Sequence, residues 1–345
     1  AKNAVTGKER GPYDETYPAL TSDERLRMAI DASIFKMHCG EGLISEEGEY
    51  SDSIFDSLVL DSNGLRCRHT ETSFEYGVEV TVQDADGNRF SSYWWDATPM
   101  LKDLNIKDCG EIAFKRAMSQ IGPVKIESGK YSMVIESEVA SRLVTPVLNA
   151  LGGYSLQQKN SFMLDSLGKK MFPEWLNIWD RPVSVGETGS RLFDSEGVAT
   201  AEMPIVENGV VKEYFVNTYM SRKMGVEATV EDATRPVVLP CFAPSVAEPV
   251  EATCGKEELM RIVGEGILVT GFNGGNSNSA TGDFSFGVEG FLFKDGKIVH
   301  PVREMLITGN LLTLWNNLLA AGNDARFCKS KLIPTLAFGN VDFSA

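Results

Sequence analysis

Hydrophobic and polar residues follow two different periods in the first third of the chain. Thr21 and Glu24 have the spacing of a helix capping box, and an apolar stripe at helical spacing continues from them to about residue 37. Over residues 53–95 the period falls to two, which places alternate side chains on one face of a strand. The Asn-Gly pair at 63–64 and the Asp-Gly pair at 86–87 favour hairpin turns. The pattern predicts a helix followed by a half-buried antiparallel meander.

A second helix is expected over residues 109–121, where the apolar spacing becomes helical again. Asp108 is placed to cap its start, and Gly122-Pro123 ends it because neither residue continues a helix well. The pattern changes just after this helix. We therefore expect two domains, a helix-and-meander domain over 1–125 and a second domain over 126–345.

The second domain is predicted to begin with a strand over residues 130–135. Ser137 is expected to cap the helix that follows, Pro146 to kink it, and Gly152-Gly153 to end it. Asn208-Gly209 lies between two apolar runs and indicates a hairpin. Shorter elements are expected over 219–224, 256–263, 266–270 and 332–338.

The most informative stretch is 271–310. It opens with a loop rich in Gly and Asn over 271–282, and backbone of this composition can come close to a ligand. Phe284, Phe286 and Val288 then alternate with polar residues and share one face of a strand. The remaining elements expected here are an Asp-Gly turn at 294–297, a return strand over 298–302 and a helix over 311–321.

Composition and charge exclude several classes of protein. The chain has 345 residues, a net charge of -15 and a pI near 4.8, which argues against direct binding of nucleic acid because that needs a basic surface. No run reaches the roughly 18 apolar residues of a membrane span. Six cysteines occur without a CxxC pair, which fits reduced thiols in the cytoplasm better than a disulfide framework.

Few residues are candidates for catalysis. The three histidines, His38, His69 and His300, lack the spacing of metal ligands, so each is assigned a surface or packing role. No GxSxG motif is present, and the Gly-rich loop lacks the Lys-Ser/Thr ending of a P-loop. Cys254, beside a possible helix start, has the best environment for a nucleophile, with a structural thiol as the alternative. Glu136 and Glu138 flank a helix start, where acidic side chains favour the helix dipole.

The segment TGDFSFGVEGFLFKDGKIVHPV, followed by ITGN, resembles the C-terminal signature of the TldD/PmbA family, also called modulators of DNA gyrase. Other segments resemble the PmbA (TldE) side of this family in the right order, among them GKYSMVIESEVASRL, KNSFMLDSLGKKMF and AAGNDARF. The resemblance covers most of the chain. It implies an α+β fold, with an antiparallel sheet and helices in the first domain and a barrel-like, mostly antiparallel β domain after it. Similar proteins have a further segment before this start.

The family is similar to a two-component cytoplasmic metalloprotease that acts on unfolded peptides and small peptide precursors. One subunit carries HExxxH on a helix, which supplies two zinc ligands and a base. By register, that motif falls on Thr145, Pro146, Val147, Leu148, Asn149 and Ala150. Cys328 lies near the position of a cysteine ligand but has no histidine partners. The resemblance therefore implies a subunit with no catalytic or metal-binding residues, and zinc only in an HExxxH-bearing, TldD-like partner.

Two hypotheses follow from the resemblance. In the first, the chain completes a shared cavity and binds an extended peptide by pairing with a strand edge. The residues expected near that peptide are Asn276, Asn278, Thr281, Gly282, Asp283, Phe284 and Ser285, with support of the hairpin as the alternative role for each. In the second, the chain is a non-enzymatic binding or regulatory protein. The resemblance also leaves open that the chain forms a homodimer when the partner is absent.

Overall fold

A computed structural model describes residues 12–38, 40–183, 187–246 and 254–345. The chain folds into two compact units. The sheet unit consists mainly of Val5–Gly122, and the barrel unit mainly of Pro123–Val183 and Arg191–Ala345. Among the described residues, no helix is both long and apolar enough to cross a membrane.

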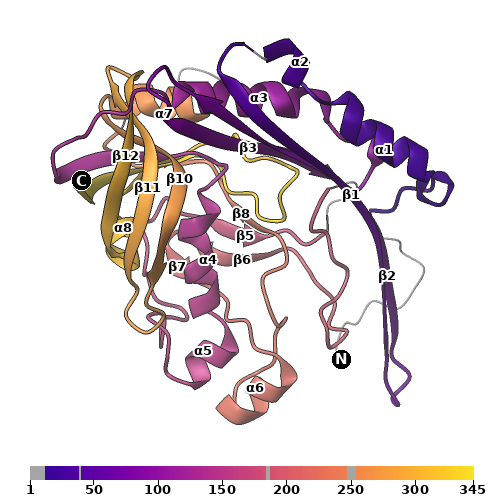
Figure 1. The fold of residues 1–345 in the computed structure, drawn as a ribbon. Helices are drawn as coiled ribbons and strands as arrows, with labels where there is room; N and C mark the ends of the chain where they lie inside the picture. The colour runs from indigo at the N-terminus through magenta and orange to yellow at the C-terminus, as the bar shows by residue number, and fades with distance from the viewer. Residues whose placement is uncertain (1–11, 39, 184–186, 247–253) are drawn as a thin grey trace. The chain divides into compact units, whose positions relative to one another are not determined.

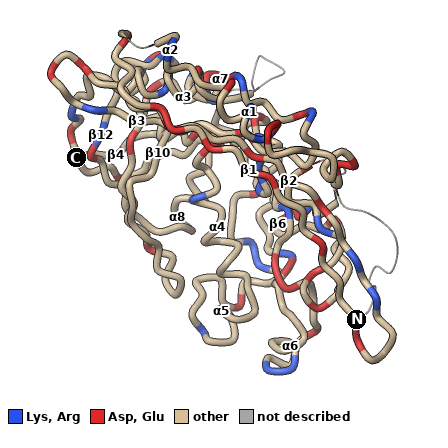
Figure 2. Tube along the Cα trace, turned by 45° about the vertical axis from the view of Figure 1, so that its right-hand side comes forward, with Lys and Arg blue, Asp and Glu red and all other residues tan. Residues whose placement is uncertain are grey.

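The sheet unit contains the predicted antiparallel meander, with strand order β1-β2-β3 (Figure 1). Its strands are β1 (Leu43–Leu60), β2 (Arg66–Gln83) and β3 (Arg89–Thr98). β1 begins ten residues before the predicted start because residues 43–52 are mostly polar and gave no alternating signal. Glu47 of β1 lies directly opposite Glu79 of β2, and acidic residues run along these strands in Figure 2. Charges of one sign along an exposed edge strand oppose pairing with other sheets.

One face of this sheet packs against a helix. Alternate residues of β2, from Tyr76 to Val82, are buried against α3 (Lys107–Ser119), as the period of two predicts. The prediction that Asp108 caps this helix was wrong. α3 begins two residues earlier than predicted, Ile106 is its N-cap, and Asp108 accepts a hydrogen bond from the Asn105 side chain at 2.9 Å. Two short 3-10 helices, Tyr17–Ala19 and Leu101–Asp103, complete the unit with the helices described next.

The capping box predicted at Thr21 is confirmed at the start of α1 (Ser22–Asp31). The Glu24 amide donates to Thr21 Oγ1 at 3.3 Å, and the Thr21 amide donates to Glu24 Oε2 at 2.8 Å. The helix ends at Asp31, earlier than predicted, and α2 (Phe35–His38) is separate. The Glu46 carboxylate accepts hydrogen bonds from the amides of residues 34 and 35. These hydrogen bonds satisfy the amides at the start of α2, which therefore begins as a second helix. The apolar stripe of α1 is exposed rather than buried.

His38 lies between two acidic partners in the sheet unit, so we expect its contribution to stability to depend on pH. Its Nε2 lies 2.9 Å from Glu111 Oε1 and its Nδ1 lies 3.1 Å from Glu41 Oε2, and these hydrogen bonds raise the pKa of His38. A raised pKa in the folded state adds stability that is complete below about pH 6.5 and disappears as pH rises through the folded pKa. We expect His38→Gln to lower the midpoint of thermal unfolding more at pH 5.5 than at pH 8.5. Equal losses at both pH values would contradict this reading.

The barrel unit contains a seven-stranded sheet, β12-β11-β10-β4-β14-β13-β9. Pairing of β12 with β14 closes five of these strands into a barrel, which confirms the barrel-like domain. All of its neighbouring strands are antiparallel except β4 and β10. The strands are β4 (Gly129–Ile135), β9 (Cys241–Phe242), β10 (Gly266–Ser277), β11 (Asp283–Lys294), β12 (Lys297–Asn310), β13 (Leu318–Ala321) and β14 (Leu336–Ser344).

Two hydrophobic cores lie on opposite faces of the barrel strands. Met133 and Ile135 of β4 belong to the larger core, whereas Val134 between them packs with α7 (Lys256–Val263) in a smaller one. The larger core also contains α4 (Ser141–Ala150) and α8 (Leu311–Asn316), which meet where Trp315 Nε1 donates to the Leu143 carbonyl. A strand segment buried on both faces has no alternating pattern, which is why Met133, Val134 and Ile135 at the end of β4 are apolar without interruption.

A smaller sheet and two short helices complete the barrel unit. The sheet has the order β7-β6-β5-β8, with β5 (Ile178–Asp180), β6 (Met203–Glu207), β7 (Val210–Val211) and β8 (Pro236–Val238). The hairpin predicted at Asn208-Gly209 joins β6 to β7, and both turn residues have positive φ. The helices are α5 (Gly153–Gln157) and α6 (Thr218–Met224), and Gly225 ends α6 in a left-handed conformation, as predicted.

Several predicted boundaries in this unit were wrong. Ser137 does not cap α4, which begins at Ser141 after a turn. β10 continues to Ser277 through the residues predicted as loop, because its glycines form bulges that keep it paired with β11. The helix predicted over 311–321 stops at Asn316, and β13 follows it because the next residues pair with β14.

Candidate functional site

The signature loop between β10 and β11 is closed by its own hydrogen bonds. The Asn278 amide donates to the Asp283 carbonyl at 2.7 Å, and the Gly282 amide donates to the Asn278 carbonyl at 2.8 Å. Asn278 Oδ1 accepts from the amides of Ala280 and Thr281 at 2.9 and 3.3 Å. Asn278, Thr281, Gly282 and Asp283 therefore lie together and form a defined turn rather than an open loop.

Asp283 connects this turn to the end of β12. Its carboxylate accepts hydrogen bonds from Thr281 Oγ1 at 2.7 Å and from Asn310 Nδ2 at 3.0 Å. These hydrogen bonds, that of Asn310 first, lower the pKa of Asp283. Asn310 also accepts from the Leu312 amide and so caps α8. The two ends of the signature, TGD and TGN, are thus joined, and the Asp283 carboxylate acts in support of the loop.

The other predicted residues face in two directions. Phe284 points into the core and stacks on Phe286, with ring centroids 5.2 Å apart. Asn276 and Ser285 lie opposite each other on β10 and β11, and both are exposed. Gly282 is buried with φ of 79°, and a Cβ there would lie 3.1 Å from Phe162 Cγ. Of the predicted set, Asn276, Asn278, Thr281, Asp283 and Ser285 are exposed, whereas Gly282 is buried and Phe284 is a core residue.

β10 presents an open backbone edge beside this loop. It pairs with β4 only over residues 267–269, after which the Glu136 amide donates to the Val269 carbonyl at 3.1 Å. Beyond that point, among the residues that the structure describes, no strand pairs with this side of β10, although β11 continues on the other side. An unpaired strand edge is a template for adding an extended peptide.

α4 lies next to this edge, and Arg142 of α4 contacts it. The Arg142 guanidinium donates to the Gly275 carbonyl at 2.7 Å and lies 5.1 Å from the centroid of the Phe286 ring. Sequence reasoning missed this residue, because nothing near Arg142 in the sequence relates it to a strand more than 130 residues later.

The α4 positions to which the resemblance assigned HExxxH are occupied by packing residues. Thr145 Oγ1 donates to the Ser141 carbonyl at 2.9 Å, and Val147, Leu148 and Ala150 are buried in the larger core. Their side chains offer no imidazole, thiolate or carboxylate, and the one amide, of Asn149, is exposed, so these positions do not fit a zinc ion. Within the described part of the chain, no cluster of three or more His, Cys, Asp or Glu is arranged to bind a metal.

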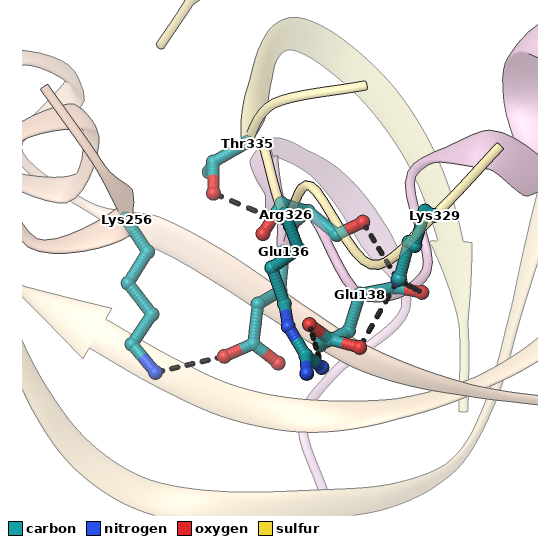
Figure 3. Close-up of polar contacts among 7 residues, drawn as sticks. Glu136, Glu138, Lys256, Arg326, Lys329 and Thr335 are labelled. Carbon is teal, nitrogen blue, oxygen red and sulfur yellow. Dashed lines mark hydrogen bonds and ion pairs between the residues drawn. The ribbon is translucent and has the colours of Figure 1, made fainter. Parts of the chain in front are cut away.

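A partly buried ion-pair network lies at the start of α4 (Figure 3). Glu138 Oε1 lies 2.8 Å from Arg326 Nη1, and Glu138 Oε2 lies 3.0 Å from Lys329 Nζ. Glu136 Oε1 lies 2.8 Å from Lys256 Nζ. The two glutamates thus do more than favour a helix dipole. They join α4 to segments far along the chain, which no local pattern could reveal.

The structure does not support Cys254, the best thiol candidate from the sequence, as a nucleophile. Cys254 is 3% exposed, and burial raises its pKa to about 11, whereas a nucleophile needs a lowered pKa. Cys328 is also buried. Cys39 lies outside the described residues.

One cavity of about 430 Å³ lies near the opposite end of β10. Its lining comes from the starts of β4 and β10, the end of β11 and the bulge of β14, and consists of Lys130, Tyr131, Ser132, Glu265, Gly266, Leu292, Phe293, Lys294 and Asn340. None of the predicted site residues lines it. We therefore take the signature loop and the open edge of β10 as the candidate site, because the backbone there has an unpaired strand edge next to a defined turn.

Comparisons with known proteins give the same assignment to both units. A family profile described as the PmbA/TldA metallopeptidase C-terminal domain matches residues 128–345, and one described as the central domain matches residues 15–121. Metalloprotease PmbA of Escherichia coli O157:H7 is 28% identical over 94% of this chain and 71% of its own length. The PmbA homolog of Haemophilus influenzae is 31% identical over 89% of this chain and 62% of its own length.

Solved structures show the same fold. A Bacteroides thetaiotaomicron protein described as a modulator of DNA gyrase superimposes with a TM-score of 0.92 and 38% identity, over 99% of this chain and 76% of its own. TldE from Thermococcus kodakarensis superimposes with a TM-score of 0.83 and 19% identity, over 99% and 79% of the two chains, and this likeness concerns the fold alone.

Proposed function

Because this chain belongs to the PmbA/TldA metallopeptidase family, we propose that it is the non-catalytic, PmbA-like subunit of a cytoplasmic two-component peptidase. Its substrates are unfolded peptides or small peptide precursors. The partner is an HExxxH-bearing, TldD-like subunit, which supplies the zinc and the cleavage chemistry. One relative of this chain, from Buchnera aphidicola, is a metalloprotease TldD homolog.

The non-catalytic assignment rests on the residue types found in α4. Where the resemblance assigns a zinc-binding motif, α4 has Thr145, Pro146 and buried aliphatic residues that belong to the core. Zinc sites are built from imidazole, thiolate and carboxylate ligands. This chain therefore contributes binding rather than metal chemistry, and no step of the reaction is assigned to its own residues.

The open edge of β10 is the feature that supports peptide binding. Residues 271–277 have a partner strand on one side only, among the residues described, and the signature turn lies at the end of this edge. An unfolded peptide can pair with such an edge through its backbone, which gives affinity with little dependence on sequence. A subunit that handles varied unfolded peptides needs this mode of recognition.

The test is hydrolysis of an unstructured peptide by the purified chain alone, by an HExxxH-bearing paralogue alone, and by their mixture, each with and without a chelator. We expect cleavage that is strongest in the mixture and is abolished by the chelator. Substituting both HExxxH histidines of the paralogue should abolish it as well, because they would hold the zinc ion.

Cleavage by this chain alone would contradict the proposal. No cleavage in a mixture of folded, metal-loaded subunits would favour the second hypothesis, a binding or regulatory protein. A homodimer formed in the absence of the paralogue and dissociated by it would agree with a subunit that uses one surface for both partners.

A further inference from the structure

Arg142 is placed on the surface where a peptide would pair with β10. It is an exposed residue in the first turn of α4, and its guanidinium donates to the Gly275 carbonyl at 2.7 Å. The same group lies over the face of Phe286, 5.1 Å from the ring centroid. The ring and the carbonyl together fix the guanidinium at the open edge, in reach of any strand added there.

The backbone of β10 is shaped to meet this arginine. Pairing with β11 changes register between Phe272 and Gly275, so β10 bulges there. Gly275 has φ of 90°, which favours glycine, and its carbonyl points to α4 instead of to a neighbouring strand. Bulges re-aim backbone groups in this way and are common beside binding sites. Arg142 thus occupies the acceptor that an added strand would otherwise use.

The charge of Arg142 has no counter-ion within the described part of the chain. Its recorded contacts are the neutral Gly275 carbonyl and the ring of Phe286. A guanidinium has five N–H donors in a planar fork that matches a carboxylate, and one donor is used here. The remaining donors, next to an open strand edge, are suited to an anionic group on a peptide.

We propose that Arg142 binds a carboxylate of the peptide that pairs with β10, either the C-terminal carboxylate or an Asp or Glu side chain, and so makes this subunit selective for peptides that carry one at that position. The inference rests on the proposed function, because it needs a peptide along β10. When the peptide amide takes the Gly275 carbonyl, the guanidinium turns from that carbonyl to the carboxylate. Arg142 is then a residue that determines specificity and takes no part in bond cleavage.

The experiment measures binding of a fluorescent, unstructured Gly/Ser/Val peptide to the full chain in three forms. One has a free C-terminus, one an amidated C-terminus, and one an amidated C-terminus with an internal aspartate. We expect one of the two carboxylate forms to bind about tenfold more tightly than the plain amide, and the arm that shows the gain identifies the source of the carboxylate. Arg142→Gln should reduce this ratio to about one, and Arg142→Lys should retain part of it.

A matched control separates specificity from structure. Arg222→Gln removes an exposed arginine from α6 of the same unit and should leave the ratio unchanged. If Arg142 only supports the bulge, Arg142→Gln weakens all three peptides equally and the ratio stays at its wild-type value, which overturns the proposal. A wild-type ratio of one also overturns it, and cleavage in the two-subunit mixture then shows that the proposed function itself still stands.

Discussion

Replacing Glu138 with alanine is expected to destabilise the protein by about 3 kcal/mol, because it leaves two cations without their shared carboxylate. Arg326 and Lys329 are 19% and 13% exposed at their side chains, and Glu138 is 10% exposed. Removing one member of a mostly buried ion pair leaves the other charge poorly solvated, which costs more than the pair itself contributes. The measurement is urea unfolding followed by tryptophan fluorescence.

The matched control is Glu207→Ala. Glu207 pairs with Lys212 at 3.1 Å, but both side chains are well exposed, at 38% and 41%. An exposed pair contributes less than about 1 kcal/mol, so this variant should unfold close to the wild-type midpoint. Equal losses for the two variants would show that the network of Figure 3 behaves as an ordinary surface ion pair.

Replacing Gly275 with alanine is expected to cost about 3 kcal/mol and to remove peptide binding. A Cβ at this position would lie 2.1 Å from the Ser285 carbonyl oxygen and 2.7 Å from Phe286 Cα, both of which are backbone atoms that cannot turn away. β10 and β11 must then separate at the bulge, and positive φ adds strain. Unfolding and peptide-binding measurements on the same sample test both expectations.

Gly274→Ala separates the clash from the strain. Gly274 also has positive φ, at 116°, but a Cβ there meets no atom within 4 Å. We expect this neighbour to lose about 1–2 kcal/mol and to retain peptide binding. Loss of binding in both variants would mean that backbone strain in this part of β10 is enough to prevent peptide binding. The close approach of β10 to β11 at Gly275 would then not be the cause.

Local patterns predicted the parts of the fold that depend on neighbouring residues. The capping box at Thr21, the alternation in β2 and the turn at Asn208-Gly209 each rest on contacts within a few residues, and each is confirmed. The extension of β10 to Ser277 could not be predicted in this way. Gly and Asn are poor strand formers, and only pairing with β11 around two bulges keeps them in the sheet.

The candidate site was predictable only where the signature itself forms it. Asn278, Thr281 and Asp283 are close in sequence and form one turn. Arg142 and Glu138 act through partners on β10 and in the 326–329 segment, so their roles appear only once the chain is folded. Predicting such contacts needs the topology, because in the sequence alone Arg142 and Glu138 look like ordinary charged residues on a solvated surface.

The measurement that tests the central claim most directly is amide hydrogen exchange of residues 271–277 with and without an unstructured peptide. If the chain binds peptide by adding a strand to β10, amides of this segment gain protection at saturating peptide, whereas those of β1 in the sheet unit do not change. Unchanged exchange of residues 271–277 at a peptide concentration that saturates binding would contradict the account, because the peptide would then be bound elsewhere.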